Sequence, residues 1–141
     1  MILCDSNVLL DVLLDDPRWA PWSLAQLEAW SRRGPVIVNP VIYAELAAGF
    51  DTIEALDREI EAMGLRFEEM PRDALFLAAK AHLLYRKRGG TRAGVLADFF
   101  VGAHAAVRRI PLLTRDARRY QACYPTVTLV TPPPAASPRA R

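Results

Sequence analysis

Four carboxylates of this sequence lie at or near the ends of predicted strands and helices. Asp5 directly follows an apolar run, in MILCDSN, and Asp116 follows another, in LLTRDARRY. Glu45 lies about a turn and a half into a helical pattern, and Asp98 is the only formally charged residue between positions 94 and 107. Carboxylates that share a small space repel one another, so that either their pKa values rise or a cation neutralises them. Oxygen-only ligands select a hard cation such as Mg²⁺ or Mn²⁺.

Each of these carboxylates also has a plain structural interpretation. Asp5 and Asp116 could cap a helix, and Glu45 could be a solvated residue on a helix surface. Asp98 is harder to explain in this way, because an unpaired carboxylate buried in an apolar helix is strongly unfavourable. Four such residues at one edge of a sheet predict a metal site, and the chemistry of a divalent ion beside a phosphate is phosphodiester hydrolysis. The sequence has no His/Cys cluster with zinc spacing.

Short β-rich apolar runs alternate with helical patterns along the chain. The predicted strands span residues 1–4, 36–38, 66–69, 112–114 and 127–130, and the predicted helices span 8–14, 20–33, 41–48, 53–63, 74–87 and 96–108. Such alternation predicts an α/β fold with a mostly parallel sheet and helices on both faces. Ligands bind beyond the carboxyl ends of the strands in such sheets, which is where the four carboxylates are expected.

Length and composition indicate a single domain. We expect this domain to span residues 1–131 of the 141, followed by a disordered tail at 132–141, which contains PPPAASPRAR. The two cysteines are too few for a disulfide framework and fit a reducing cytosol. The N-terminus does not resemble a secretory signal, and the weakly charged run at 94–107 is too short to span a membrane. We therefore expect a cytoplasmic protein.

The charge balance is close to neutral, with 18 Lys and Arg against 16 Asp and Glu, or +2. If a cation neutralises the four candidate carboxylates, 18 basic side chains face 12 acidic ones, or +6. Such a surface could attract a polyanion. A basic loop is the candidate for phosphate contacts, although a solvated helix end explains its charge equally well. Its residues are Arg86, Lys87, Arg88 and Arg92.

Two further polar features are expected to be structural. His104 lies six positions after Asp98, which is not one helical face, and we expect it to be a packed or partly exposed structural histidine. Asp11, Asp15 and Asp16 form a small acidic patch. We expect this patch to be solvated surface.

The segments CDSNVLLDVLL, NPVIYAEL, LADFFVGAHA and LLTRDARRY, in this order and spacing, resemble the PIN-domain ribonucleases. They look most like the VapC toxins of type II toxin–antitoxin pairs, over nearly the whole chain up to about Val130. The resemblance implies a three-layer α/β/α fold with a parallel five-stranded sheet of order 3-2-1-4-5.

The resemblance also implies a set of site residues. Asp5, Glu45, Asp98 and Asp116 match the acidic residues of a site for Mg²⁺ or Mn²⁺. We expect Asp5, Asp98 and Asp116 to hold the ion, and Glu45 to position the attacking water or to assist its deprotonation. Asn7 and Thr114 match positions that support the site by hydrogen bonding.

The activity implied by the resemblance is endonucleolytic cleavage of RNA that leaves 5′-phosphate and 3′-hydroxyl ends. A homodimer and a cognate antitoxin that blocks the cleft are implied as well. Some relatives carry a further acidic residue in the helix after Asp98, where this sequence has Val101 and Gly102. We therefore expect one well-held metal ion, with any second ion recruited by the substrate phosphate.

Three other classes of protein are alternatives to this one. A haloacid-dehalogenase-like phosphotransferase expects DxD after the first strand, where this chain has Asp5-Ser6-Asn7, and it also needs a later lysine. A receiver domain fails similarly, because it needs paired acidic residues after the first strand and a lysine after the last. A non-catalytic RNA- or protein-binding module is the other alternative, and an activity assay separates it from a nuclease.

Overall fold

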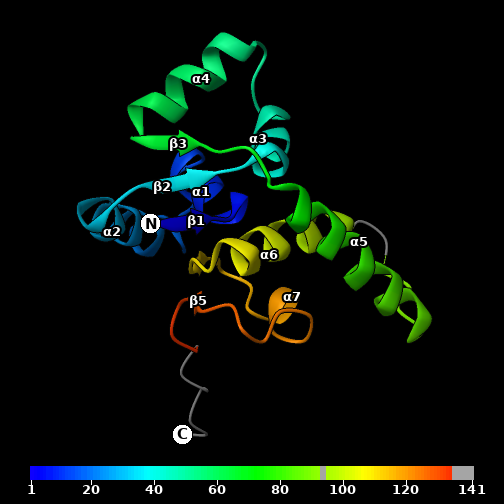
Figure 1. The fold of residues 1–141 in the computed structure, drawn as a ribbon. Coiled ribbons are helices and arrows are strands. Elements are labelled where there is room, and N and C mark those ends of the chain that lie inside the picture. The colour runs from blue at the N-terminus through cyan, green and yellow to red at the C-terminus, as the bar shows by residue number, and fades with distance from the viewer. Residues whose placement is uncertain (93–94, 135–141) are drawn as a thin grey trace, which may run out of the picture.

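Five short strands pair in parallel at the centre of the computed structural model, which describes residues 1–92 and 95–134 (Figure 1). They lie in the order β3-β2-β1-β4-β5, which confirms the expected order. Their bounds are β1 (Ile2–Cys4), β2 (Val36–Val38), β3 (Leu65–Phe67), β4 (Leu112–Leu113) and β5 (Leu129–Val130).

The central strands are apolar along their whole length because both of their faces are covered. β1, β2 and β4 are fully buried, whereas the edge strands β3 and β5 are partly exposed. Leu3 of β1 pairs with Ile37 on one side and with Leu112 on the other. β1 is therefore the middle of the sheet, and its carboxyl end is the middle of the edge where ligands of such folds bind.

Seven helices are found in the described part of the chain, and they cover both faces of the sheet. Their bounds are α1 (Ser6–Leu13), α2 (Ala20–Arg33), α3 (Pro40–Ala47), α4 (Ile53–Ala62), α5 (Arg72–Lys87), α6 (Leu96–Arg108) and α7 (Arg118–Gln121). In Figure 1, α1 and α2 lie behind the sheet and α6 lies in front of it, while α5 packs on α6 and extends to the right beyond the sheet. The three-layer α/β/α arrangement is thus confirmed, and α7 is the helix that the sequence patterns do not predict.

Three helices begin at a side chain that caps them, which are α1, α3 and, through Thr52, α4. The side chain of Asn39 accepts a hydrogen bond from the backbone N–H of Ile42 at 2.9 Å, and Pro40 takes the first position of α3. Asp5 caps α1 in the same manner, through the backbone N–H of Ser6. Asp5 therefore has the structural role of a cap and also lies at the end of β1.

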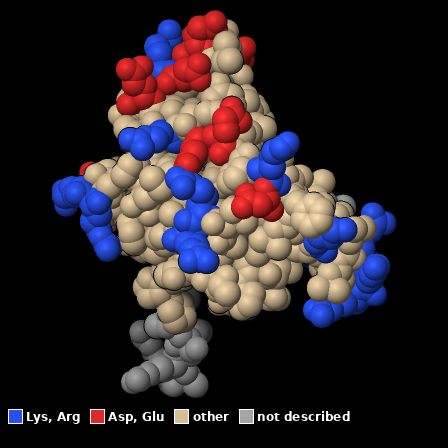
Figure 2. Space-filling model, in the orientation of Figure 1, with Lys and Arg blue, Asp and Glu red and all other residues tan. Residues whose placement is uncertain are grey.

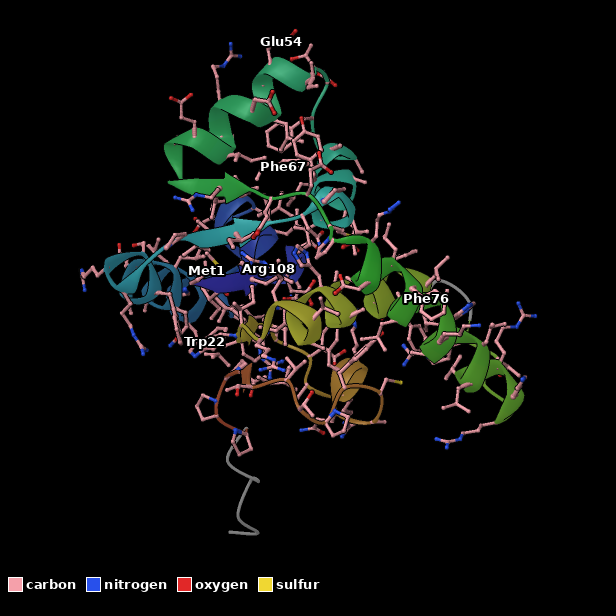
Figure 3. All side chains as sticks on the ribbon, in the orientation of Figure 1. Met1, Trp22, Glu54, Phe67, Phe76 and Arg108 are labelled. Atoms are coloured by element: carbon pink, nitrogen blue, oxygen red, sulfur yellow. The ribbon has the colours of Figure 1, made fainter. Side chains whose placement is uncertain are left out.

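A second core lies between α5 and α6 and includes Phe99 and Tyr124. Gly102 of α6 is required there, because a Cβ at this position would lie 2.3 Å from the ring of Tyr124 and 3.2 Å from that of Tyr120. The turn after Asp98 is thus packed against tyrosine rings, which leaves no room for an acidic side chain at position 102. On the outer surface of α5, by contrast, Phe76 points toward solvent (Figure 3).

The ends of the chain are described only in part. Most of the predicted disordered tail, residues 135–141, lies outside the described residues, as do residues 93–94 of the loop before α6. The domain boundary at 131 stays a prediction. Cys4 and Cys123 are both free thiols. No helix among residues 1–92 and 95–134 is both long and apolar enough to cross a membrane.

Candidate active site

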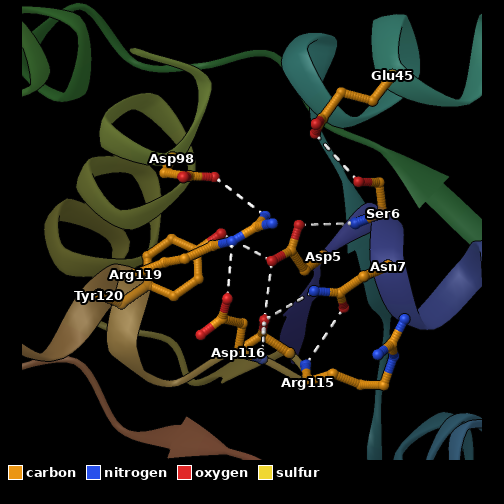
Figure 4. Close-up of polar contacts among 10 residues, drawn as sticks. Asp5, Ser6, Asn7, Glu45, Asp98, Arg115, Asp116, Arg119 and Tyr120 are labelled. Atoms are coloured by element: carbon orange, nitrogen blue, oxygen red, sulfur yellow. Dashed lines mark hydrogen bonds and ion pairs between the residues drawn. The ribbon is translucent and has the colours of Figure 1, made fainter. Parts of the chain in front are cut away.

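The candidate site lies at the carboxyl ends of β1 and β4, where α1, α6 and α7 meet (Figure 4). Asp5 follows β1, Asp98 lies in the first turn of α6, and Asp116 follows β4. Their side chains face a common space, into which Arg119 of α7 also projects. The structure therefore brings three of the four candidate carboxylates together from segments far apart in the sequence.

Asp5 is the most tightly held of these carboxylates, and only 2% of its surface is exposed. Its Oδ1 accepts a hydrogen bond from the backbone N–H of Ser6 at 2.8 Å. Its Oδ2 accepts two more, from the hydroxyl of Thr114 at 2.8 Å and from the hydroxyl of Tyr120 at 2.7 Å. These donors satisfy the buried charge and fix the plane of the carboxylate.

Asn7 and Thr114 connect the start of α1 to the loop after β4. The Thr114 hydroxyl accepts hydrogen bonds from Nδ2 of Asn7 at 3.3 Å and from the backbone N–H of Asp116 at 3.2 Å. Oδ1 of Asn7 accepts a further bond from the backbone N–H of Arg115 at 3.2 Å. The two residues proposed as supports thus take part in one network with Asp5, and this network orients the backbone that carries Asp116.

Arg119 lies between two of the carboxylates. Its Nε donates to Oδ2 of Asp116 at 3.1 Å, and its Nη1 donates to Oδ1 of Asp98 at 3.4 Å. Burial alone would lower the pKa of Arg119, but the charges of Asp98 and Asp5 outweigh burial and raise it. The guanidinium is therefore the positive charge that balances these carboxylates in the structure.

The surroundings of Asp98 disfavour its charged form. Burial raises its pKa, the charges of Asp5 and Asp116 raise it further, and the charge of Arg119 offsets part of this rise. A carboxyl group whose pKa stays raised beside an arginine lacks full compensation for its charge. Additional positive charge beside Asp98 would therefore stabilise its ionised carboxylate.

Glu45 lies on the other side of the space, on α3, and is more exposed than the other three. Its Oε1 accepts a hydrogen bond from the hydroxyl of Ser6 at 3.1 Å. Burial and the charge of Asp5 raise its pKa, while the hydrogen bond from Ser6 lowers it. Ser6 thus connects Glu45 with Asp5, whose Oδ1 accepts from the backbone of the same residue.

The donor set fits a hard divalent cation in its chemistry. The acidic groups are all carboxylates, and two of them have pKa values raised by burial and by neighbouring negative charge. Their present geometry is not that of a finished cage: within the described residues, no three His, Cys, Asp or Glu side chains are grouped so that they could hold a metal ion. Arg119 lies between Asp98 and Asp116, and the oxygens of Asp5 are engaged by hydrogen-bond donors.

The expected acidic patch at Asp11, Asp15 and Asp16 is not one solvated surface. Asp11 is 3% exposed, accepts a hydrogen bond from the Ser23 hydroxyl at 2.7 Å, and pairs with Nε of Arg115 at 2.7 Å. The expectation for Asp11 was wrong because the sequence does not show that Arg115 reaches back to α1. This buried pair fixes the residue between Thr114 and Asp116.

His104 is fully buried on α6, as expected for a packed histidine. The side-chain oxygen of Asn39 already caps α3, so its Nδ2 faces Nδ1 of His104, at 3.1 Å. Nδ1 must then be the acceptor, which assigns the proton of the neutral ring to Nε2. Burial lowers the pKa of His104 further below its usual value.

The basic residues of the candidate phosphate-binding loop lie at the outer end of α5. Arg86, Lys87 and Arg88 are exposed there. Basic side chains gather over this end of α5 at the right of Figure 2, whereas α4 at the top of that view is largely acidic. A hollow of about 550 Å³, lined in part by Arg86, Arg92 and Leu96, separates this end of α5 from the start of α6. It leads from the basic loop toward the helix that carries Asp98.

Sequence reasoning missed three contributors to the site, which are Ser6, Arg119 and Tyr120. Arg119 and Tyr120 follow Asp116 by three and four positions, in RDARRY. Residues at this spacing return to the same face once a helical turn forms. Recognition of α7 would have placed both beside the carboxylates.

Comparison with known protein families places most of the chain in one family. The sequence model described as PIN domain matches residues 2–123. No curated protein sequence matches the chain.

Several solved structures share the fold at low sequence identity. VapBC2 from Rickettsia felis, bound to a DNA fragment from its promoter, is 15% identical with a TM-score of 0.72, covering 93% of this chain and 98% of that chain. VapBC-1 from nontypeable Haemophilus influenzae is 18% identical with a TM-score of 0.68, covering 93% and 98%. A toxin–antitoxin complex from Klebsiella pneumoniae is 22% identical with a TM-score of 0.63, covering 93% and 97%.

Proposed function

The chain belongs to the PIN-domain family, and from this premise we propose that it is a divalent-metal-dependent endoribonuclease, the toxin of a toxin–antitoxin pair. One observation carries the proposal. Asp5, Asp98 and Asp116 face a common space at the carboxyl edge of the sheet, with a cation, Arg119, already between two of them. A site of this composition is suited to a cation and to a phosphate that the cation can polarise.

Asp5, Asp98 and Asp116 would hold Mg²⁺ or Mn²⁺. When bound, such an ion polarises a phosphoryl oxygen and lowers the pKa of a water molecule. Asp5 is oriented for this role by Thr114 and Tyr120, and Asp116 by the network of Asn7 and Thr114.

Glu45 would orient the attacking water and accept its proton. Its pKa is raised, its side chain is accessible, and Ser6 holds one of its oxygens. Attack on the phosphorus with loss of the 3′ oxygen gives 5′-phosphate and 3′-hydroxyl ends.

The substrate is proposed to be single-stranded RNA that follows the basic end of α5 toward Asp98. Arg86, Lys87, Arg88 and Arg92 would contact backbone phosphates, which supply most of the affinity in such complexes. The hollow between α5 and α6 gives a path of suitable size for this strand.

The partners are proposed on the basis of the shared fold. The similar structures are VapBC assemblies and a toxin–antitoxin complex. We accordingly propose a cognate antitoxin that covers the cleft, a homodimer of this chain, and action in the cytoplasm on cellular RNA. Residues 1–131 would form the nuclease domain and 132–141 a tail outside it.

The test is cleavage of total cellular RNA, mapped by sequencing of the new 5′ ends. The wild-type protein with Mg²⁺ should produce discrete cuts that disappear with EDTA and with Asp98→Asn. Asp51→Asn is the matched control, because it makes the same change at an exposed position on the loop between α3 and α4. Absence of metal-dependent cuts with the wild-type protein would favour the non-catalytic binding module instead.

A further inference from the structure

The guanidinium of Arg119 lies between the carboxylates of Asp98 and Asp116. It is 3.4 Å from one carboxylate and 3.1 Å from the other. Asp98 and Arg119 belong to different helices, α6 and α7, so their contact is a tertiary one, whereas Asp116 lies only three positions before Arg119. The other ion pairs among the described residues, Arg108 with Glu68 and Arg115 with Asp11, each join one arginine to one carboxylate.

The charges around Arg119 explain why it is held there. The negative charges of Asp98, Asp5 and Asp116 all act on the guanidinium. An arginine cannot give up its proton within the range of pH at which proteins are folded, so the charge can leave this space only if the side chain moves. Such movement is open to it, because 35% of the side chain is exposed and α7 lies at the surface.

We propose that Arg119 is a built-in counter-cation of the metal-free cleft, which must turn out toward solvent before a divalent ion can be held by Asp98 and Asp116. This inference rests on the proposed function and deepens it, because it makes metal affinity the outcome of a competition with a residue of the same chain. The guanidinium and the metal ion would compete for the negative charge of the same two carboxylates, of which Arg119 already engages one oxygen each.

The alternative is that Arg119 permanently ties α7 to α6 and so keeps Asp98 and Asp116 together. The two roles predict opposite effects of removing Arg119 on the affinity for the metal ion. If Arg119 competes with the metal, its removal tightens metal binding. If Arg119 is a tie, its removal lets the two carboxylates separate and weakens metal binding.

The experiment measures the Kd for Mn²⁺ by titration calorimetry, with the full chain as wild type, Arg119→Gln and Arg118→Gln. Arg118 is the matched control, since it is an exposed arginine on the same short helix and its loss changes the net charge equally. We expect Arg119→Gln to bind Mn²⁺ roughly fivefold to tenfold more tightly than wild type, as for the loss of a partly exposed competing ion pair. Arg118→Gln should stay within about twofold of wild type, the small effect of an exposed charge that makes no close pair.

A second readout separates competition from a general change in the protein. In EDTA, Arg119→Gln should have a lower Tm than wild type, because the crowded carboxylates lose their counter-cation. With saturating Mn²⁺, this difference should shrink or reverse, because the ion then neutralises the same groups. A deficit in Tm that is equal with and without Mn²⁺ would contradict the proposal.

Equal or weaker binding of Mn²⁺ by Arg119→Gln would also overturn the role of Arg119 while leaving the metal site in place. Failure of all three chains to bind Mn²⁺ would overturn the proposed function as well, so the two failures are distinguishable. If Arg119→Gln does not fold, an NMR titration of the wild-type protein tests the proposal instead. The Nε–H signal of Arg119 should shift during titration with Mg²⁺, with the same midpoint as binding, and a signal that does not move would contradict the proposal.

Discussion

The hydroxyl of Tyr120 donates a hydrogen bond to Oδ2 of Asp5 across 2.7 Å and so joins α7 to the end of the central strand β1. Tyr120 is fully buried, and the same oxygen of Asp5 also accepts from Thr114. Burial and the negative charge of Asp5 raise the pKa of Tyr120, which keeps its proton in place at neutral pH. A helix of only four residues is thus part of the framework that fixes Asp5.

The first prediction concerns Tyr120→Phe, which keeps the packed ring and removes only the donor. Oδ2 of Asp5 loses a hydrogen-bond donor while it stays buried and charged. The free energy of unfolding should therefore fall by about 1.5–3 kcal/mol. Cleavage should fall as well, since Asp5 is then held by fewer donors. Urea unfolding and the RNA cleavage assay measure the two effects.

Tyr124→Phe is the matched control for this change. The hydroxyl of Tyr124 is also buried, but it donates to a neutral acceptor, the backbone carbonyl of Phe99, at 2.7 Å. Its loss should cost about 1 kcal/mol and leave cleavage unchanged. If both variants lowered cleavage equally, the effect of Tyr120 would have to be assigned to packing rather than to Asp5.

The parts of the site that the sequence predicts are those fixed by the strands. Asp5 and Asp116 directly follow apolar runs, and Asp98 is isolated in an apolar helix, so strand ends and charge pattern locate them. The sheet order also agrees with the family resemblance. Local sequence is sufficient here because parallel strands bring their carboxyl ends to the same edge.

The parts that could not be predicted depend on contacts between distant segments. Asp11 looks like a solvated neighbour of Asp15 until Arg115 is seen to reach it from the loop after β4. Tyr120 and Arg119 look like surface residues of a basic segment, because α7 is too short to give a helical pattern. Their roles follow from tertiary packing, to which periodicity is insensitive.

The second prediction concerns the ion pair between the buried Asp11 and Arg115, whose side chain is 28% exposed. Arg115→Met keeps the length of the side chain but leaves Asp11 buried, with the Ser23 hydroxyl as its remaining side-chain partner. A buried charge that loses its counter-ion is strongly unfavourable, so the free energy of unfolding should fall by about 3–5 kcal/mol. Urea unfolding at neutral pH checks this value.

Two further variants show whether the cost comes from the stranded charge. The double variant Arg115→Met with Asp11→Asn should recover much of the lost stability, because no charge is then left unpaired. Arg108→Met breaks the pair with Glu68, which is more accessible to water, and should cost about 1 kcal/mol or less. A double variant no more stable than Arg115→Met alone would contradict this explanation.

The third prediction is a pH dependence caused by His104. Its pKa is lowered in the folded state by burial, so the unfolded chain takes up a proton first as the pH falls below about 6.5. The stability that the neutral ring contributes is therefore complete above this pH and is lost progressively below it. Protonation would also set Nδ1–H against the donating Nδ2 of Asn39.

The measurement is urea unfolding between pH 7 and pH 5 for wild type and His104→Gln. The variant should be less stable at pH 7, but its stability should fall less between these values, since no buried imidazole is present. His82→Gln is the control, because His82 lies on α5 and is only partly buried. An equal fall in wild type and His104→Gln would show that other groups cause the dependence.

The last prediction concerns RNA binding by the basic end of α5. With Asp98→Asn as the background, so that RNA is not cut, Arg86, Lys87 and Arg88 are changed together to Gln. Each phosphate contact with a single strand contributes about 0.7 to the slope of log K against log salt concentration, so three lost contacts should reduce this slope by about 2.

A control with three other exposed arginines, Arg32, Arg33 and Arg58, removes the same charge from α2 and α4. If RNA follows the hollow between α5 and α6, only the first set lowers both the affinity and the slope, whereas equal losses would mean that the RNA responds to net charge alone.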